Sequence, residues 1–134
     1  MSAYLHRPIH SETDASRAVL EATLFAREAG FDETGSQMIA TSVSELVRNV
    51  LKYAGSGVLE LRLVKVDAGS GVEIEVTDHG PGIADCELAL QDHFSSSGTL
   101  GMGLPAVRRM MDDFELASAP GEGTRVLARK WLSS

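Results

Sequence analysis

Two segments of alternating apolar and polar residues, 58–66 and 72–78, limit the possible folds more than any other feature of this sequence. A period of two is typical of strands with one buried face. The glycine-containing stretch 67–71 lies between them and predicts a hairpin. The second strand would place Asp78 on the same face as its apolar residues, so we expect this carboxylate to point toward the core.

Helical patterns precede the hairpin. Ser11 and Asp14 are typical of a helix start, and apolar periodicity predicts a helix over 11–30 that ends at Gly30. A second amphipathic helix is expected over about 35–53. Helices that precede a hairpin in this way favour a sheet with a helical layer on one face.

The rest of the chain is expected to continue this arrangement. The patterns predict a helix over 104–114 with Pro105 in a tolerated first-turn position, a short helix near 85–92 and a loop over 93–103. Further strands are expected over 4–9, 114–119 and 124–131. This order of elements predicts an α+β fold, a two-layer α/β sandwich with helices on one face of a mixed, mostly antiparallel sheet.

Composition limits the class of protein. A chain of 134 residues, 43% hydrophobic and 23% charged, predicts one globular domain over 1–134. Its apolar runs are too short to span a bilayer and the first ten residues lack an apolar signal core, so no membrane partner is expected. A single cysteine, Cys86, excludes an intrachain disulfide and indicates a reducing cytoplasm. The net charge of −7 argues against a nucleic-acid partner.

Asp78 begins a loop, "DHGPGI", that contains more glycine and proline than a plain turn requires. One interpretation is an aspartate that caps its own turn, as Asp-x-Gly often does. The other is a carboxylate that accepts a hydrogen bond from the exocyclic amine of adenine, whereas the guanine carbonyl would be repelled. In that case Gly80 and Gly82 would let a flat base approach the backbone. This segment alone leaves both interpretations open.

Three polar residues of the second predicted helix, Glu45, Asn49 and Lys52, form one stripe roughly opposite its apolar side. A solvated helix face is the simple interpretation. If a ligand lay above the stripe, the Asn49 carbonyl would suit Mg²⁺, which keeps several waters and binds phosphates. Lys52 could then pair with a phosphate, and Glu45 could take a proton from a hydroxyl nucleophile.

Glycines also precede the helix predicted from residue 104, at Gly98, Gly101 and Gly103. A glycine-rich loop that opens a helix presents backbone N–H groups to anions, although a plain flexible loop is the alternative. The stretch also matches a G-x-G-x-x-A dinucleotide fingerprint, but no buried strand precedes it. The "PGEGT" stretch is an ordinary hairpin turn, in which Thr124 becomes important only if it lies beside Asp78.

The four motifs occur in an order that resembles the GHKL ATPase superfamily, which includes histidine kinases, gyrase-type topoisomerases and anti-sigma-factor kinases. The order is an E-x-x-x-N helix, D-x-G-x-G after a strand, a G-x-G loop opening a helix, and G-x-G-T, over about residues 35–131. Within the superfamily, "SELVRNVLKYAGSG", "DHGPGI", "GMGLPAVRRMMDDFEL" and "PGEGT" are similar to the serine/threonine switch kinases of the RsbT type, the kinase of the stressosome. The resemblance implies the Bergerat fold, an α/β sandwich.

Carried over by residue, the resemblance implies a site for ATP and Mg²⁺. Asp78 would hold the adenine amine, helped by Gly82 and Thr124, and Asn49 would coordinate Mg²⁺. Glu45 would be the general base, and a lid over about 93–103 would wrap the phosphates. Lys52 departs from the RsbT pattern and is similar to histidine kinases, which leaves its phosphate contact open. The implied nucleotide-binding residues are Asn49, Lys52, Asp78, Gly80, Gly82, Gly98, Thr99, Gly101, Gly103, Leu104 and Thr124.

The resemblance therefore implies an ATP-dependent protein serine/threonine kinase whose substrate is a STAS-domain antagonist. It also implies that the released kinase binds and activates a PP2C-type phosphatase. Two alternatives stay open. One is an anti-sigma factor that sequesters a sigma factor directly, with kinase activity secondary, and the other is a nucleotide sensor without transfer activity.

Overall fold

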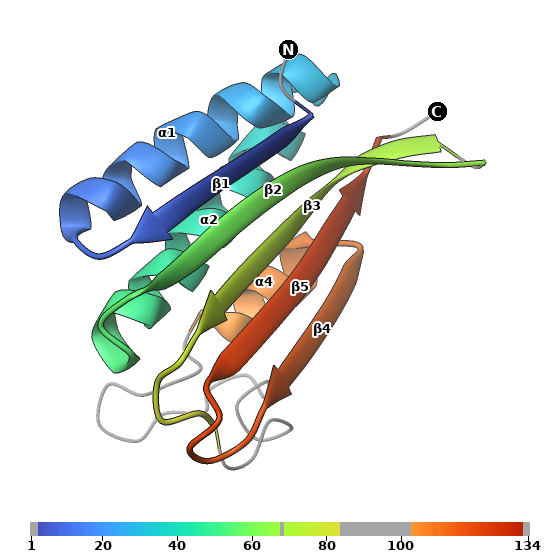
Figure 1. Cartoon of the computed structure of the whole chain (residues 1–134). Coiled ribbons are helices and arrows are strands. Elements are labelled where there is room, and N and C mark those ends of the chain that lie inside the picture. The colour runs from blue at the N-terminus through green and yellow to red at the C-terminus, as the bar shows by residue number, and fades with distance from the viewer. Residues whose placement is uncertain (1–2, 68, 84–102, 133–134) are drawn as a thin grey trace.

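The helices of the protein cover one face of a five-stranded sheet (Figure 1). The structure is a computed structural model that describes residues 3–67, 69–83 and 103–132. Along the chain the elements are β1 (Tyr4–Ile9), α1 (Glu12–Ala29), α2 (Glu33–Tyr53), β2 (Gly57–Val66), β3 (Gly69–Asp78), α4 (Leu104–Met110), β4 (Asp113–Ser118) and β5 (Thr124–Trp131). None of the described helices is long and apolar enough to cross a bilayer.

The first two helices begin and end through local capping. The Ser11 side chain accepts a hydrogen bond from Asp14 N at 3.2 Å at the start of α1, and Gly30 adopts a left-handed φ of 110° at its end. Gly30 N–H donates to the carbonyls of Ala26 and Arg27. The Asp32 side chain caps α2 in the same way as Ser11 caps α1. The predicted capping of α1 is therefore confirmed.

The sheet order is β1-β2-β3-β5-β4, and every pairing among the described strands is antiparallel. β2 and β3 form the predicted hairpin, and β4 and β5 form the closing one. β3 and β5 are neighbours in the sheet although residues 79–123 separate them in sequence. The predicted two-layer sandwich with a mostly antiparallel sheet is confirmed.

The helix predicted over 104–114 ends earlier than expected. α4 stops at Met110, and Met111 already has extended backbone dihedrals. Asp113 and Phe114 belong to β4, where they lie opposite Arg129 and Ala128 of β5. Strand pairing with a distant segment therefore overrides the helical pattern of this stretch.

The core lies between the helices and the inner face of the sheet. Alternate strand residues point toward the helices and are almost completely buried: Leu59, Leu61, Val72, Ile74, Val76, Val126 and Ala128. The same phase carries Asp78 toward the helical side at the end of β3, as the alternation predicts.

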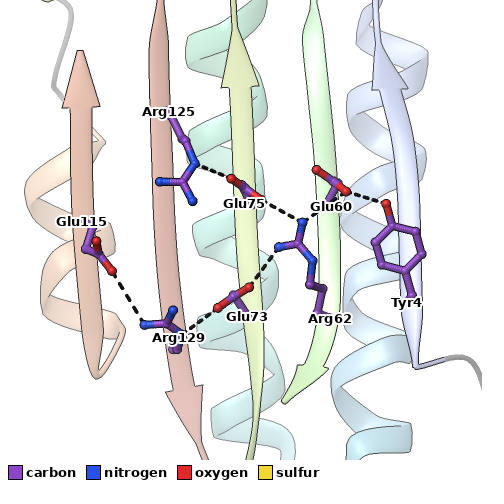
Figure 2. A network of polar contacts seen from close by, with 8 residues as sticks. All are labelled: Tyr4, Glu60, Arg62, Glu73, Glu75, Glu115, Arg125 and Arg129. Carbon is purple, nitrogen blue, oxygen red and sulfur yellow. Dashed lines mark hydrogen bonds and ion pairs between the residues drawn. The ribbon is translucent and has the colours of Figure 1, made fainter.

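Charged residues cover the outer face of the sheet, away from the helices (Figure 2). Arg62 on β2 donates hydrogen bonds to Glu73 at 2.9 Å and to Glu75 at 2.8 Å. Arg129 donates to Glu73 at 2.6 Å, and Arg125 donates to Glu75. Burial acts to raise the pKa of Glu75, but the hydrogen bonds from the two arginines outweigh it and hold the pKa below its ordinary value. This network stabilises the charges on a face that no described helix covers.

Candidate functional site

A pocket opens between α2 and the inner face of the sheet, at the end of the sheet where β3 stops. We call it the α2–sheet pocket; the pocket and its mouth together hold about 460 Å³ of empty space, open solvent included. Its walls combine apolar side chains with a few polar ones: Leu46, Asn49, Val50, Tyr53, Ala54, Val76, Asp78, Pro81, Gly82, Ile83, Leu104, Thr124 and Val126.

Asp78 and Thr124 face each other across the β3–β5 pairing and both line the α2–sheet pocket. Because partners in an antiparallel pair share one face, the carboxylate and the hydroxyl sit side by side at the sheet end. Thr124 therefore lies beside Asp78, which is the position in which it was expected to become important.

The two interpretations of Asp78 prove compatible. Its Oδ1 accepts a hydrogen bond from Gly80 N at 2.9 Å, which is the turn-capping contact. Its Oδ2 has no hydrogen-bond partner in the described ranges of the chain. One oxygen thus stabilises the loop and the other remains available to a donor in the pocket.

Gly80 and Gly82 serve a purpose different from the expected one. Gly82 has a left-handed φ of 79°, and a Cβ there would lie 2.0 Å from Ala119 O. A Cβ on Gly80 would lie 2.6 Å from Ala54 Cβ. The space that a side chain would take is filled by the protein itself, so these glycines permit close contact between segments rather than room for a base. Gly82 still lines the α2–sheet pocket, whereas Gly80 acts through the turn of Asp78.

The polar stripe of α2 is only partly solvated. Asn49 lines the α2–sheet pocket together with Leu46 and Val50, so it borders the apolar side of the helix rather than lying opposite it. Glu45 is half-buried one turn earlier and packs against Gly103, where a Cβ would lie 2.3 Å from Glu45 Oε2. Lys52 is exposed, is absent from the described pocket lining, and holds its Nζ 5.2 Å from the centre of the Tyr53 ring.

A divalent cation would find few protein ligands here. Among the described residues, no three His, Cys, Asp or Glu side chains gather into a metal site. Asn49 offers an amide oxygen in the pocket wall, and its side chain makes no hydrogen bond within the described ranges that would compete for this oxygen. One oxygen ligand fits Mg²⁺, because this ion usually binds phosphates and waters and needs few protein groups.

The glycine-rich segment is described only at its end. Gly103 is the N-cap residue of α4, and Leu104 begins the helix and lines the α2–sheet pocket. Gly98, Thr99 and Gly101 lie outside the described residues, as do the short helix expected near 85–92 and nearly all of the loop expected over 93–103.

Two groups of residues in and behind the pocket wall were missed in the sequence. Apolar side chains such as Leu46 and Ile83 form most of the wall, yet periodicity assigns such residues only to a core. Ser118 was also missed, although its Oγ accepts from Ile83 N at 2.7 Å and lies 2.9 Å from Thr124 Oγ1. The register of the closing hairpin, counted outward from its turn, places Ser118 opposite Thr124 and is the signal that could have found it.

Comparison with known proteins agrees with this geometry. Residues 10–130 match the family described as the histidine kinase-like ATPase domain. The chain belongs to this family. The histidine kinase-like ATPase chain is 46% identical over 107 residues to the serine/threonine-protein kinase RsbT of Bacillus subtilis (strain 168), with 80% of each protein covered. It is 35% identical over 100 residues to an anti-sigma F factor of Thermoanaerobacter sp. (strain X514), with 72% of this chain and 70% of that protein covered.

Solved structures show the same fold. The mycobacterial sensor histidine kinase MprB superposes with a TM-score of 0.55 at 22% identity, covering 96% of this chain and 100% of that chain. The Acinetobacter baumannii histidine kinase AdeS gives a TM-score of 0.51 at 18% identity, covering 98% of this chain and 68% of that one. The expected GHKL-type fold and the RsbT-type resemblance are confirmed, and RsbT bears out the expected enzyme class, a protein serine/threonine kinase.

Proposed function

We propose that this chain is an ATP- and Mg²⁺-dependent protein serine/threonine kinase that phosphorylates a STAS-domain antagonist in a partner-switching pathway. The observation that carries the proposal is the pairing of Asp78 with Thr124 at the edge of an apolar pocket. A flat ring fits between apolar walls, and a carboxylate oxygen at their end selects a hydrogen-bond donor. An adenine ring with its exocyclic amine has both properties.

The phosphates would extend from the pocket along α2 toward Gly103. Glu45 and Asn49 lie one helical turn apart on this path, and Glu45 packs against Gly103 at the start of α4. Mg²⁺ bound to Asn49 and to the phosphates would neutralise charge on the transferred group. This arrangement separates recognition of the base from the chemistry.

In the proposed transfer, Glu45 accepts the proton of a serine or threonine hydroxyl on the partner. The hydroxyl oxygen forms a bond to the γ-phosphorus as the bond from that phosphorus to the β–γ bridging oxygen breaks, and ADP leaves. Within the described ranges no hydrogen bond or ion pair engages the Glu45 carboxylate, so its oxygens remain available to accept that proton. Lys52, Gly98, Thr99 and Gly101 are proposed as further phosphate contacts on the family resemblance alone.

The proposed location of the protein and its proposed action on a phosphatase also rest on the family resemblance. We propose that the kinase works in the cytoplasm and that, once released by its phosphorylated substrate, it binds and activates a PP2C-type phosphatase. Direct sequestration of a sigma factor is the second candidate, favoured by the relatives named anti-sigma F factor. The higher identity to a protein named as a serine/threonine kinase favours the first.

The test combines capture with transfer. The parent protein and Glu45→Gln would be used as baits in lysate of the native cell with Mg²⁺-ATP, and captured proteins would be mapped for new phosphosites. We expect a STAS-domain protein with both baits and its phosphorylation with the parent only. Capture of a sigma factor without phosphorylation of any STAS protein would instead establish the second candidate. ATP binding with no transfer to any captured protein would contradict the kinase proposal and indicate a nucleotide sensor.

A further inference from the structure

Three polar side chains form a row across the end of the sheet. Ser118, the last residue of β4, lies opposite Thr124 of β5, which in turn lies opposite Asp78 of β3. Cross-strand partners share a face, so all three side chains point toward the helical side. Asp78 and Thr124 reach the α2–sheet pocket, and Ser118 stands behind Thr124.

The hydrogen bonds of Ser118 determine the direction of the Thr124 hydroxyl. Ser118 Oγ accepts from Ile83 N at 2.7 Å, lies 2.7 Å from Gly123 O and lies 2.9 Å from Thr124 Oγ1. A carbonyl can only accept, so the single Ser118 proton goes to Gly123 O. Among the contacts of the described residues, the proton in the 2.9 Å contact then comes from Thr124 Oγ1. Thr124 Oγ1 therefore has only lone pairs to offer to the pocket.

We propose that Ser118 is a positioning residue that sets base selectivity through Thr124. It holds the Thr124 proton away from the pocket, so that Thr124 Oγ1 and Asp78 both present acceptors to the base. Such a pair favours a purine with an amine at position 6 and disfavours one with a carbonyl there, because lone pairs would then face lone pairs. The inference rests on the proposed nucleotide-binding function and adds a residue outside the pocket wall to it.

The same contacts tie two loops together. Ile83 N reaches Ser118 Oγ from the loop after β3, while Gly121 N donates to Pro81 O at 2.7 Å from the turn before β5. Loss of the Ser118 hydroxyl would free the Thr124 hydroxyl to rotate while the Gly121–Pro81 contact still joins the loops. Selectivity should therefore change more than overall affinity for ATP.

The experiment measures the dissociation constants of ATP and of inosine triphosphate with Mg²⁺, for the parent, three single variants and one double variant. Inosine triphosphate carries a carbonyl and a ring N–H where ATP carries an amine and a bare ring nitrogen. Ser118→Ala should lower the preference for ATP about three- to tenfold, the range for one hydrogen bond gained or lost. Ser118→Thr, which keeps a hydroxyl, should retain the parental preference. A fraction of unfolded protein scales both affinities equally and leaves their ratio unchanged.

Thr124→Val tests the direction of the hydroxyl without touching Ser118. If Thr124 offers lone pairs, its removal also lowers the preference for ATP, and adding Ser118→Ala then changes the ratio no further. A higher preference for ATP in Thr124→Val, or a ratio in Ser118→Ala within twofold of the parent, would overturn the inference while leaving ATP binding and the proposed function intact. Failure of the parent to bind ATP would overturn both.

Discussion

Gly103 packs so closely against Glu45 that a Cβ on the glycine would lie 2.3 Å from Glu45 Oε2 and 2.9 Å from Glu45 Cβ. The contact joins the middle of α2 to the start of α4, two elements that the chain brings together from either side of β2 and β3. It fixes the position of the Glu45 carboxylate beside Gly103, the last glycine of the glycine-rich segment. The proposed general base is thus held by packing, and its carboxylate forms no ion pair with the other described residues.

Glu45→Gln keeps the size of this side chain and removes its ability to accept a proton. We expect phosphotransfer to fall about 10²- to 10⁴-fold, the usual contribution of a general base, while ATP affinity stays within about threefold. Transfer to the captured STAS protein and ATP titration would measure the two effects. Glu28→Gln, the same change on the exposed side of α1, is the matched control. Unchanged transfer in Glu45→Gln would exclude Glu45 as the base.

Asp78→Asn is expected to weaken ATP binding about 10- to 100-fold, the range for a hydrogen bond to a charged group. The asparagine oxygen would keep the contact with Gly80 N, so its NH₂ group would face the pocket and meet the adenine amine donor to donor. Calorimetric titration with ATP would measure the loss. Asp67→Asn, at the opposite end of β3, should bind ATP as the parent does, and equal affinities for Asp78→Asn and the parent would rule out the adenine contact.

Gly82→Ala and Gly121→Ala form a matched pair that separates backbone strain from lack of space. The two glycines have nearly the same left-handed φ, 79° and 77°, but only Gly82 is enclosed, by Ala119 O. We expect Gly121→Ala to lower the free energy of unfolding by about 1 kcal/mol and Gly82→Ala by about 2–4 kcal/mol. Urea unfolding of both variants would measure this. Equal losses would mean that the segment around Gly82 moves to admit a methyl group.

The low pKa of Glu75 predicts a pH-dependent contribution to stability. Its folded pKa lies below the unfolded value of about 4.3, so the stabilisation is complete above that pH and is lost as pH falls through the folded pKa. Glu75→Gln should therefore lower the free energy of unfolding at pH 7, and the difference from the parent should shrink below about pH 4. Urea unfolding between pH 3 and 7 would measure it.

Glu115→Gln provides the comparison for Glu75. The Glu115 side chain is 63% exposed and its oxygen lies 3.7 Å from Arg129, so its ion pair should contribute little. A Glu75→Gln difference that is constant with pH would show that lost packing, rather than lost charge, causes the effect.

Much of the fold could be predicted because its signals are local. Side-chain alternation identified β2 and β3 and the inward direction of Asp78, and the capping residues Ser11 and Gly30 gave the limits of α1. The end of α4 was misjudged because residues near Phe114 carry a helical pattern, and their pairing with β5 depends on a distant segment.

The site was harder to predict because it depends on contacts between segments. Periodicity placed Asn49 on a solvated face, since it describes a helix without the elements that close over its side. The glycines after Asp78 were interpreted as room for a base, whereas Ala54 and Ala119 occupy that room. Predicting the position of Ser118 required the register of the β4–β5 hairpin, which depends on two segments together.

The pairing of β3 with β5 has a consequence for how such a chain can diverge. Residues 79–123 form the connection between two strands that are neighbours in the sheet. Lengthening a flexible loop within such a connection costs only about 0.6 kcal/mol of loop-closure free energy for each doubling of the loop's length. Residues can therefore be inserted between Ile83 and Gly103 at little cost while the β3–β5 pairing, and with it Asp78 and Thr124, stays as it is. In this way, related chains can acquire new partners near the proposed phosphate site without a change in the residues that recognise the base.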